Sequence, residues 1–238
     1  MTDHQPSPET NTPAAKSGKL DNLEQAATIN FRSELARKTI HLFSLSIPLI
    51  YFFISRSLAL MLLIPLTAAF VGVDLARFYI PVVGQWFTRW FGWLLRKHEQ
   101  NMNVKRLNGA SHVLISATLC VLLFPKIITI NAFAILIISD STSALFGRRF
   151  GRHRFLGKSL EGSIAFFVSA VLVIFAAPKV RYLPMEYFIG IIAAAVGAVV
   201  EAFSVHIDDN LSIPLSVGIV MWGLYLWLLP SVNVFGLQ

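Results

Sequence analysis

The chain has 238 residues, of which 55% are hydrophobic and only 14% are charged. Its mean hydropathy of +0.64 is too apolar for an ordinary soluble domain and indicates a chain solvated largely by lipid. A net charge of +7 would suggest nucleic acid in a soluble protein. Most basic residues here flank apolar runs, however, so membrane topology explains the charge and we expect no nucleic-acid partner.

The apolar runs predict an all-α fold, a polytopic transmembrane helix bundle of about seven spans. Residues 1–30 are rich in Ser, Thr, Pro and acidic residues and are expected to form a disordered tail. Residues 31–238 are expected to form a single transmembrane catalytic domain. The predicted spans are 39–55, 57–76, 110–125, 127–147, 161–178, 185–204 and 212–230. The runs lack the period-two alternation of barrel strands, which argues against a β-barrel.

Lysine and arginine are distributed unevenly between the two sets of loops that this layout defines. Only Arg56, Lys126, Lys179 and Arg181 fall on one side, and the other basic residues fall on the side of the amino terminus. The positive-inside rule therefore places the amino terminus in the cytoplasm, in a bacterial inner membrane or its equivalent. Between the second and third spans, residues 86–97 mix aromatic and basic side chains, which predicts a segment that lies on the membrane surface.

The first polar group lies where the chain enters the membrane. Glu34, Arg37, Lys38 and His41 are spaced so that one face of a helix carries all four. Arg37 and Lys38 could simply snorkel to lipid headgroups. They could equally neutralise a triphosphate, the arginine through two parallel N–H donors of its guanidinium group and the lysine through the single charge of its ammonium group.

The second group is an acid within an apolar helix, Asp140, followed by a stripe of small residues that includes Gly147 and Gly151. A carboxylate at membrane depth is costly and usually marks a functional site. The alternatives are a structural ion pair for Asp140 and close helix packing for the stripe. Asn108 with Gly109 forms a weaker element earlier in the chain, which could be only a helix start.

A basic glycine-containing loop follows, from Arg148 to Ser159. Its G-x5-G-K-S pattern is one residue too long for a Walker motif and follows a membrane helix, so we reject a P-loop fold. Gly151, Arg152, Gly157 and Lys158 still suit an anion cradle at the start of the next helix. The alternative is a positive-inside loop in which Ser159 caps that helix and Glu161 stabilises its first turn.

The last group combines Glu201, inside an apolar run, with Asp208, Asp209 and Asn210 in a predicted turn. Two carboxylates and an amide in a tight turn suit Mg²⁺, which prefers oxygen ligands. A solvated turn that begins a helix is the alternative. All these groups fall at the predicted cytoplasmic ends of spans, so the sequence predicts one shared site at that face.

At these residues the chain resembles the CTP-dependent lipid alcohol kinases, which include dolichol kinase, phytol kinase and fungal-type diacylglycerol kinase. The resemblance covers about residues 34–220 and is most specific in D-S-x-S-A-x-x-G-x-x-x-G, from Asp140 to Gly151. It continues in G-K-S-x-E-G from Gly157 and in E-x(6)-D-D-N-L-x-I-P-L from Glu201. E-x-x-R-K-x-x-H from Glu34 and N-G at Asn108 support it.

This resemblance implies transfer of the γ-phosphoryl group of CTP to the hydroxyl of a membrane lipid, and it implies activity-related roles for Arg37, Lys38, Asp140 and Gly147. In the working mechanism Mg²⁺ is held by Asp140 with help from Asp208 or Glu161. The phosphates bind to Arg37, Lys38 and Lys158, within a nucleotide site that extends to Asn108, Gly147, Gly151, Arg152, Gly157 and Ser159. Glu201 or His41 takes the alcohol proton.

Two other functions stay open at this stage. The sequence also looks similar to phosphatidate cytidylyltransferases, which make CDP-diacylglycerol from CTP. An ion-coupled transporter would use Asp140 and Glu201 at membrane depth, although its polar residues should be spread through the bilayer rather than gathered at one face.

Overall fold

The computed structural model describes residues 38–92, 107–203 and 208–236. Its helices are α2 (Ser46–Phe53), α3 (Arg56–Tyr79), α4 (Pro81–Phe91), α6 (Gly109–Leu123), α7 (Lys126–Phe150), α8 (Leu160–Ala176), α9 (Pro184–Phe203) and α10 (Asp209–Leu228). Two short antiparallel strands, β1 (Arg154–Phe155) and β2 (Lys158–Ser159), join α7 to α8. Each predicted span coincides with helix, which confirms the helical fold.

Four helices, α3, α7, α9 and α10, are long and apolar enough to cross a membrane. The segments at Lys38–Phe53, Gly109–Leu123 and Leu160–Ala176 are apolar but shorter. The first of them is broken, since Ser44 and Leu45 form a turn between the helical residues 38–43 and α2. Pro48 lies in the first turn of α2, where a missing N–H is tolerated but the ring prevents an uninterrupted helix from residue 38. The number of complete spans stays a prediction.

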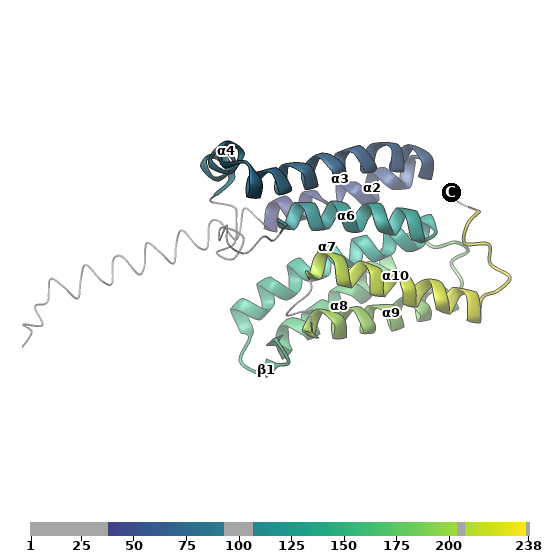
Figure 1. The fold of residues 1–238 in the computed structure, drawn as a ribbon. Coiled ribbons are helices and arrows are strands. Elements are labelled where there is room, and N and C mark those ends of the chain that lie inside the picture. Colours follow the sequence, from purple (N-terminus) through teal and green to yellow (C-terminus); the bar gives the residue numbers. More distant parts are fainter. Residues whose placement is uncertain (1–37, 93–106, 204–207, 237–238) are drawn as a thin grey trace, which may run out of the picture.

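Helix α7 forms the centre of the bundle (Figure 1). It packs against α8, α10 and α2, and 72% of its most apolar 18-residue window is buried inside the protein. By contrast, only 17% of the corresponding window of α3 is buried, so most of α3 faces outward. A central helix with large buried side chains such as Phe133 and Ile137 gives Asp140, at its polar end, a firmly packed backbone.

At the end of the bundle away from β1, basic side chains cap helix carboxyl ends. The Arg56 guanidinium donates to the carbonyl of Leu122, the Lys126 ammonium donates to Ile54 O at 2.8 Å, and Lys179 donates to Ala177 O at 2.7 Å. Carbonyls at a helix terminus lack intrahelical partners, and cations there also complement the helix dipole. Three of the four basic residues predicted on the non-cytoplasmic side thus have a local structural role.

Helix α4 lies across the end of the bundle rather than along it (Figure 1). Trp86 and Trp90 are exposed on it, whereas Phe87 is buried beneath the Arg77 guanidinium, 5.0 Å from the ring centroid. The first half of the predicted surface segment, Trp86 to Phe91, therefore belongs to an amphipathic helix at one end of the bundle. The remainder, residues 93–97, lies outside the described residues.

Candidate functional site

The polar ends of six helices and the β1–β2 hairpin meet at one end of the bundle (Figure 1). They are the carboxyl ends of α3, α7 and α9 and the amino ends of α6, α8 and α10. Groups far apart in sequence are thereby gathered at a single end, as the shared-site prediction requires. Which side of the membrane this end faces stays a prediction.

Asp140 forms an ion pair across the site with the first helical segment. The Lys38 ammonium donates to Asp140 Oδ2 at 2.8 Å, and His41 Nε2 lies 3.6 Å from the same oxygen. The carboxylate is largely buried. Lys38 and His41 thus both contact the acid of α7, while Arg37 and Glu34, the other members of the predicted face, lie outside the described residues.

Lys158, at the start of β2, joins two further carboxylates. Its ammonium donates to Glu201 Oε1 and to Asp209 Oδ2, both at 2.8 Å. Although burial opposes the charged form of Lys158, the carboxylates of Asp209 and Glu201 raise its pKa above the ordinary value. Lys158 is therefore held as a cation between the carboxyl end of α9 and the amino end of α10.

Glu201 is almost fully buried, and both of its oxygens are occupied. The Ser143 hydroxyl donates to Oε1 at 2.8 Å and the Ser163 hydroxyl donates to Oε2 at 3.3 Å, in addition to the Lys158 contact. A buried carboxylate is tolerated when it is paired and hydrogen-bonded in this way. In this arrangement Glu201 organises α7, α8 and β2, and acting as a proton acceptor would require one of these bonds to open.

The two ion-paired groups form one electrostatic cluster. The charge of Lys158 also acts on Asp140, and Asp209 interacts with both Asp140 and Glu201. We call Asp140, Glu201, Asp209, Lys38 and Lys158 the charge cluster. Three carboxylates facing two ammonium groups in a partly buried site can bind a polyanion and its metal only if the lysines exchange carboxylate for phosphate oxygens.

The basic loop is a β-hairpin and not a P-loop, which confirms rejection of the Walker fold. Arg154 pairs with Ser159 and Phe155 with Lys158, leaving a two-residue turn. The N–H of Gly157 donates to Ala202 O at 3.2 Å and the N–H of Leu160 donates to His153 O at 3.0 Å. These N–H groups are occupied within the protein, so anion binding here falls mainly to side chains.

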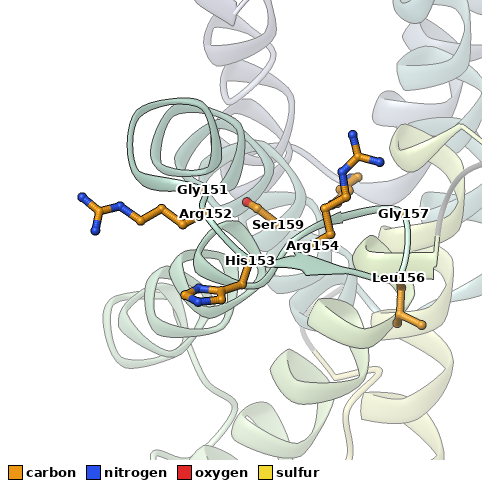
Figure 2. A pocket seen from close by; sticks show the side chains of 8 residues that line it. Gly151, Arg152, His153, Arg154, Leu156, Gly157 and Ser159 are labelled. Carbon is orange, nitrogen blue, oxygen red and sulfur yellow. The ribbon is translucent and has the colours of Figure 1, made fainter.

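A cavity of about 460 Å³ adjoins this hairpin. Residues 151–154 and 156–159 line it, and Figure 2 shows Arg152 and Arg154 extending from it in different directions. The predicted cradle residues Gly151, Arg152, Gly157, Lys158 and Ser159 therefore do surround one hollow. Their binding of nucleotide stays a prediction.

The glycine stripe has a packing role around Ser159. A Cβ added to Gly147 or to Gly162 would lie 2.9 Å from Ser159 Oγ, and one added to Gly151 would lie 2.2 Å from Gly147 O. Ser159 itself caps α8 by accepting from the N–H of Gly162. The packing and capping alternatives therefore apply to these residues, whether or not they also bind a ligand.

The predicted metal ligands Asp140, Glu161 and Asp208 have separate partners. Glu161 accepts from His153 Nδ1 at 2.8 Å on the outer side of the hairpin, and Asp208 caps α10 by accepting from the N–H of Asn210. Among the described residues, no three His, Cys, Asp or Glu side chains form a metal-binding group. Mg²⁺ commonly needs only one or two carboxylates together with substrate phosphates, and Asp140 and Asp209 are the carboxylates of the charge cluster that bear on this requirement.

A second buried network, which the sequence reasoning missed, holds the amino end of α6. Asp74 is fully buried and accepts from Asn108 N at 2.8 Å, Asn108 Nδ2 at 2.9 Å and Ser111 Oγ at 2.6 Å. Arg77 Nε lies 3.2 Å from Asp74 Oδ1, the oxygen that also accepts from Asn108 Nδ2. Asn108 is thus a helix cap anchored by α3. The signal was available, because Asp74, like Asp140, is a carboxylate within an apolar run.

Comparisons with known proteins give two relatives that match most of the chain and nearly all of their own length. An uncharacterized protein of Rickettsia prowazekii is 35% identical over 195 residues, which cover 79% of this chain and 93% of that protein. An uncharacterized protein of Methanocaldococcus jannaschii is 28% identical over 198 residues, covering 79% and 92%. The chain belongs to the same family as the Rickettsia protein.

A relative with a named activity matches a shorter stretch. The phytol kinase of Synechocystis is 33% identical over 96 residues, which cover 37% of this chain and 41% of the kinase. No protein-family model and no solved structure matches the chain.

Proposed function

We propose that this protein is a membrane lipid kinase that transfers the γ-phosphoryl group of CTP to the hydroxyl of a lipid alcohol. The charge cluster carries this proposal, because it pairs Asp140 with Lys38, and Lys158 with Glu201 and Asp209, at one polar end of an otherwise apolar bundle. The partial similarity to a phytol kinase supports a lipid alcohol as acceptor. Polyprenol, dolichol, phytol and diacylglycerol are the candidate acceptors.

The chain's own residues would act mainly by positioning and neutralisation. In phosphoryl transfer the acceptor oxygen attacks the γ-phosphorus, the bond to the CDP oxygen breaks and the hydroxyl proton leaves to a base. Lys38 and Lys158 would move from carboxylates to phosphate oxygens and hold the triphosphate. His41 and Glu201 are the candidate bases, and Glu201 would first have to release one of its three hydrogen bonds.

Mg²⁺ is the metal that this reaction would require. Asp140 and Asp209 would hold it, because the side chains of Glu161 and Asp208 are engaged by His153 and Asn210, and it would supply charge neutralisation of the triphosphate. This assignment rests on carboxylates that already pair with cations, because Lys158 contacts Asp209 and Lys38 contacts Asp140.

Position-specific labelling of CTP tests the reaction. We expect purified protein with Mg²⁺ and a panel of lipid alcohols to move label from the γ position into lipid, and to lose this activity when the metal is chelated. Label that enters phosphatidic acid from the α position would instead establish a cytidylyltransferase. Ion flux across vesicles without either product would establish a transporter and end the kinase proposal.

Sidedness is tested by cysteine labelling in a Cys120→Ala background. We propose that the charge cluster faces the cytoplasm, so an impermeant reagent outside intact cells should label Arg181→Cys and miss Arg154→Cys. Arg181 is exposed in the loop between α8 and α9, at the opposite end of the bundle from Arg154. Lys179, in the same loop, is unsuitable because it is buried and caps α8. The reverse labelling pattern would contradict the cytoplasmic site.

A further inference from the structure

The tip of the β1–β2 hairpin combines an unfavourable backbone with exposed apolar side chains. Leu156, the first residue of the two-residue turn, has a φ of 55°. A left-handed conformation is rare for a bulky residue, and glycine is the usual occupant of such a turn position. Nevertheless the Leu156 side chain is 53% exposed and that of Phe155 is 42% exposed. The strained position therefore carries a leucine that leaves about half of its side chain exposed.

This tip extends the outer surface of a membrane-spanning helix. The hydrogen bond from Gly157 N to Ala202 O places the turn against the carboxyl end of α9. Phe203, the next residue, is 61% exposed, and Val199, one turn earlier, is also exposed. Helix α9 is one of the four helices long and apolar enough to span a bilayer, so we expect its exposed apolar side chains to contact lipid.

The charge around the tip fits an anionic surface. Arg152 and Arg154 are exposed on the hairpin, and Arg148 with Arg149 lies in the last turn of α7. Of the acids in contact with this segment, Glu161 is engaged by His153, and Glu201 and Asp209 are paired with Lys158. In Figure 2 the Leu156 side chain extends away from that of Arg154. An apolar tip flanked by arginines is suited to the boundary between acyl chains and phosphate headgroups.

A second residue shows the same combination independently. Within the described residues, Tyr182 is the other non-glycine residue in the left-handed region, with a φ of 57°. It is an exposed aromatic residue in the loop between α8 and α9, at the opposite end of the bundle. Tyrosine is enriched where proteins meet the membrane–water interface. Both left-handed positions thus carry large, exposed side chains, one aliphatic and one aromatic, in loops at the ends of apolar helices.

We propose that the hairpin tip, Phe155–Leu156, inserts into the headgroup region of an anionic phospholipid leaflet, with Arg152 and Arg154 on the phosphates. Lipid contact with the leucine would offset the strain of its backbone, which solvent contact would not. This inference needs only membrane insertion and is independent of the kinase proposal.

A fluorophore at the tip tests the insertion. Leu156→Cys, in the Cys120→Ala background, is labelled with an environment-sensitive dye and reconstituted in phosphatidylcholine vesicles with or without phosphatidylglycerol. We expect quenching by a shallow lipid-attached quencher to be several-fold stronger than at His153→Cys, and quenching by aqueous iodide to be weaker. His153 is the matched control because it lies on the same hairpin and its side chain is 76% exposed. Phosphatidylglycerol should increase the difference.

Equal iodide quenching at positions 156 and 153 would overturn the proposal, and so would a lipid-quenching difference that phosphatidylglycerol does not increase. Leu156→Gly provides a label-free test in the same anionic vesicles, since glycine adopts this backbone without strain. If lipid holds the leucine, the variant's thermal midpoint should not exceed that of the wild type. A rise of several degrees would mean that the side chain contributes nothing to offset its strain.

Discussion

Asp140→Asn is expected to lower phosphoryl transfer on the order of 100-fold or more, while the protein remains folded and inserted. The amide keeps the shape of the side chain and can still accept from Lys38, which lies 2.8 Å from Asp140 Oδ2. It loses the negative charge that the proposal assigns to the metal. Turnover per inserted molecule, measured with γ-labelled CTP across a range of Mg²⁺ concentrations, reports this loss.

Glu161→Gln is the matched control for this experiment. Glu161 was also predicted to bind metal, but its side chain accepts from His153 on the outer side of the hairpin, away from the Lys38–Asp140 pair. We expect this variant to retain most of the activity and the Mg²⁺ dependence of the wild type. Wild-type turnover in a correctly inserted Asp140→Asn protein would reduce Asp140 to a structural ion-pair partner.

Much of this fold could be predicted because lipid imposes a simple pattern on a sequence. Continuous apolar runs located each of the helices in the bundle, and the isolated acids within them marked the polar end. The two-strand hairpin was beyond this reasoning, since a four-residue pairing around Leu156 and Gly157 has no periodic signal. Asp74 was missed for a different reason. Its network depends on Asn108, and only the packing of α3 on α6 brings the two together.

The sequence predicted which residues belong to the site better than it predicted which of them form ion pairs. Sequence spacing placed Lys38 and His41 on one helix face, and the structure directs that face at Asp140. No spacing rule could assign Lys158 to Glu201 and Asp209, because these residues belong to β2, α9 and α10. Of the adjacent acids, Asp208 was preferred as a ligand. Asp209 is the one that reaches the charge cluster, while Asp208 caps its own helix.

Lys158→Gln is expected both to abolish turnover and to lower the free energy of unfolding by about 3 kcal/mol. Glu201, whose side chain is only 2% exposed, would keep its charge but lose its cationic partner. Because the pKa of Lys158 is raised, its stabilising contribution is complete at every pH below the ordinary lysine value and is lost only as the pH rises through the higher folded value. Thermal unfolding at neutral pH therefore reports the whole effect. Arg154→Gln, on the paired strand, should change stability by no more than about 0.5 kcal/mol.

The double variant Lys158→Gln/Glu201→Gln separates the two roles of the lysine. Removing both charges leaves Ser143 and Ser163 with an amide partner, and the carboxylate that still lacks its cation is Asp209, whose side chain is 25% exposed, so much of the lost stability should return. Turnover should not return, because the ammonium that would bind phosphate is still absent. Recovery of activity together with stability would show that Lys158 acts only by neutralising Glu201, and the nucleotide phosphates would then have to be held by Lys38 and by basic residues outside the charge cluster.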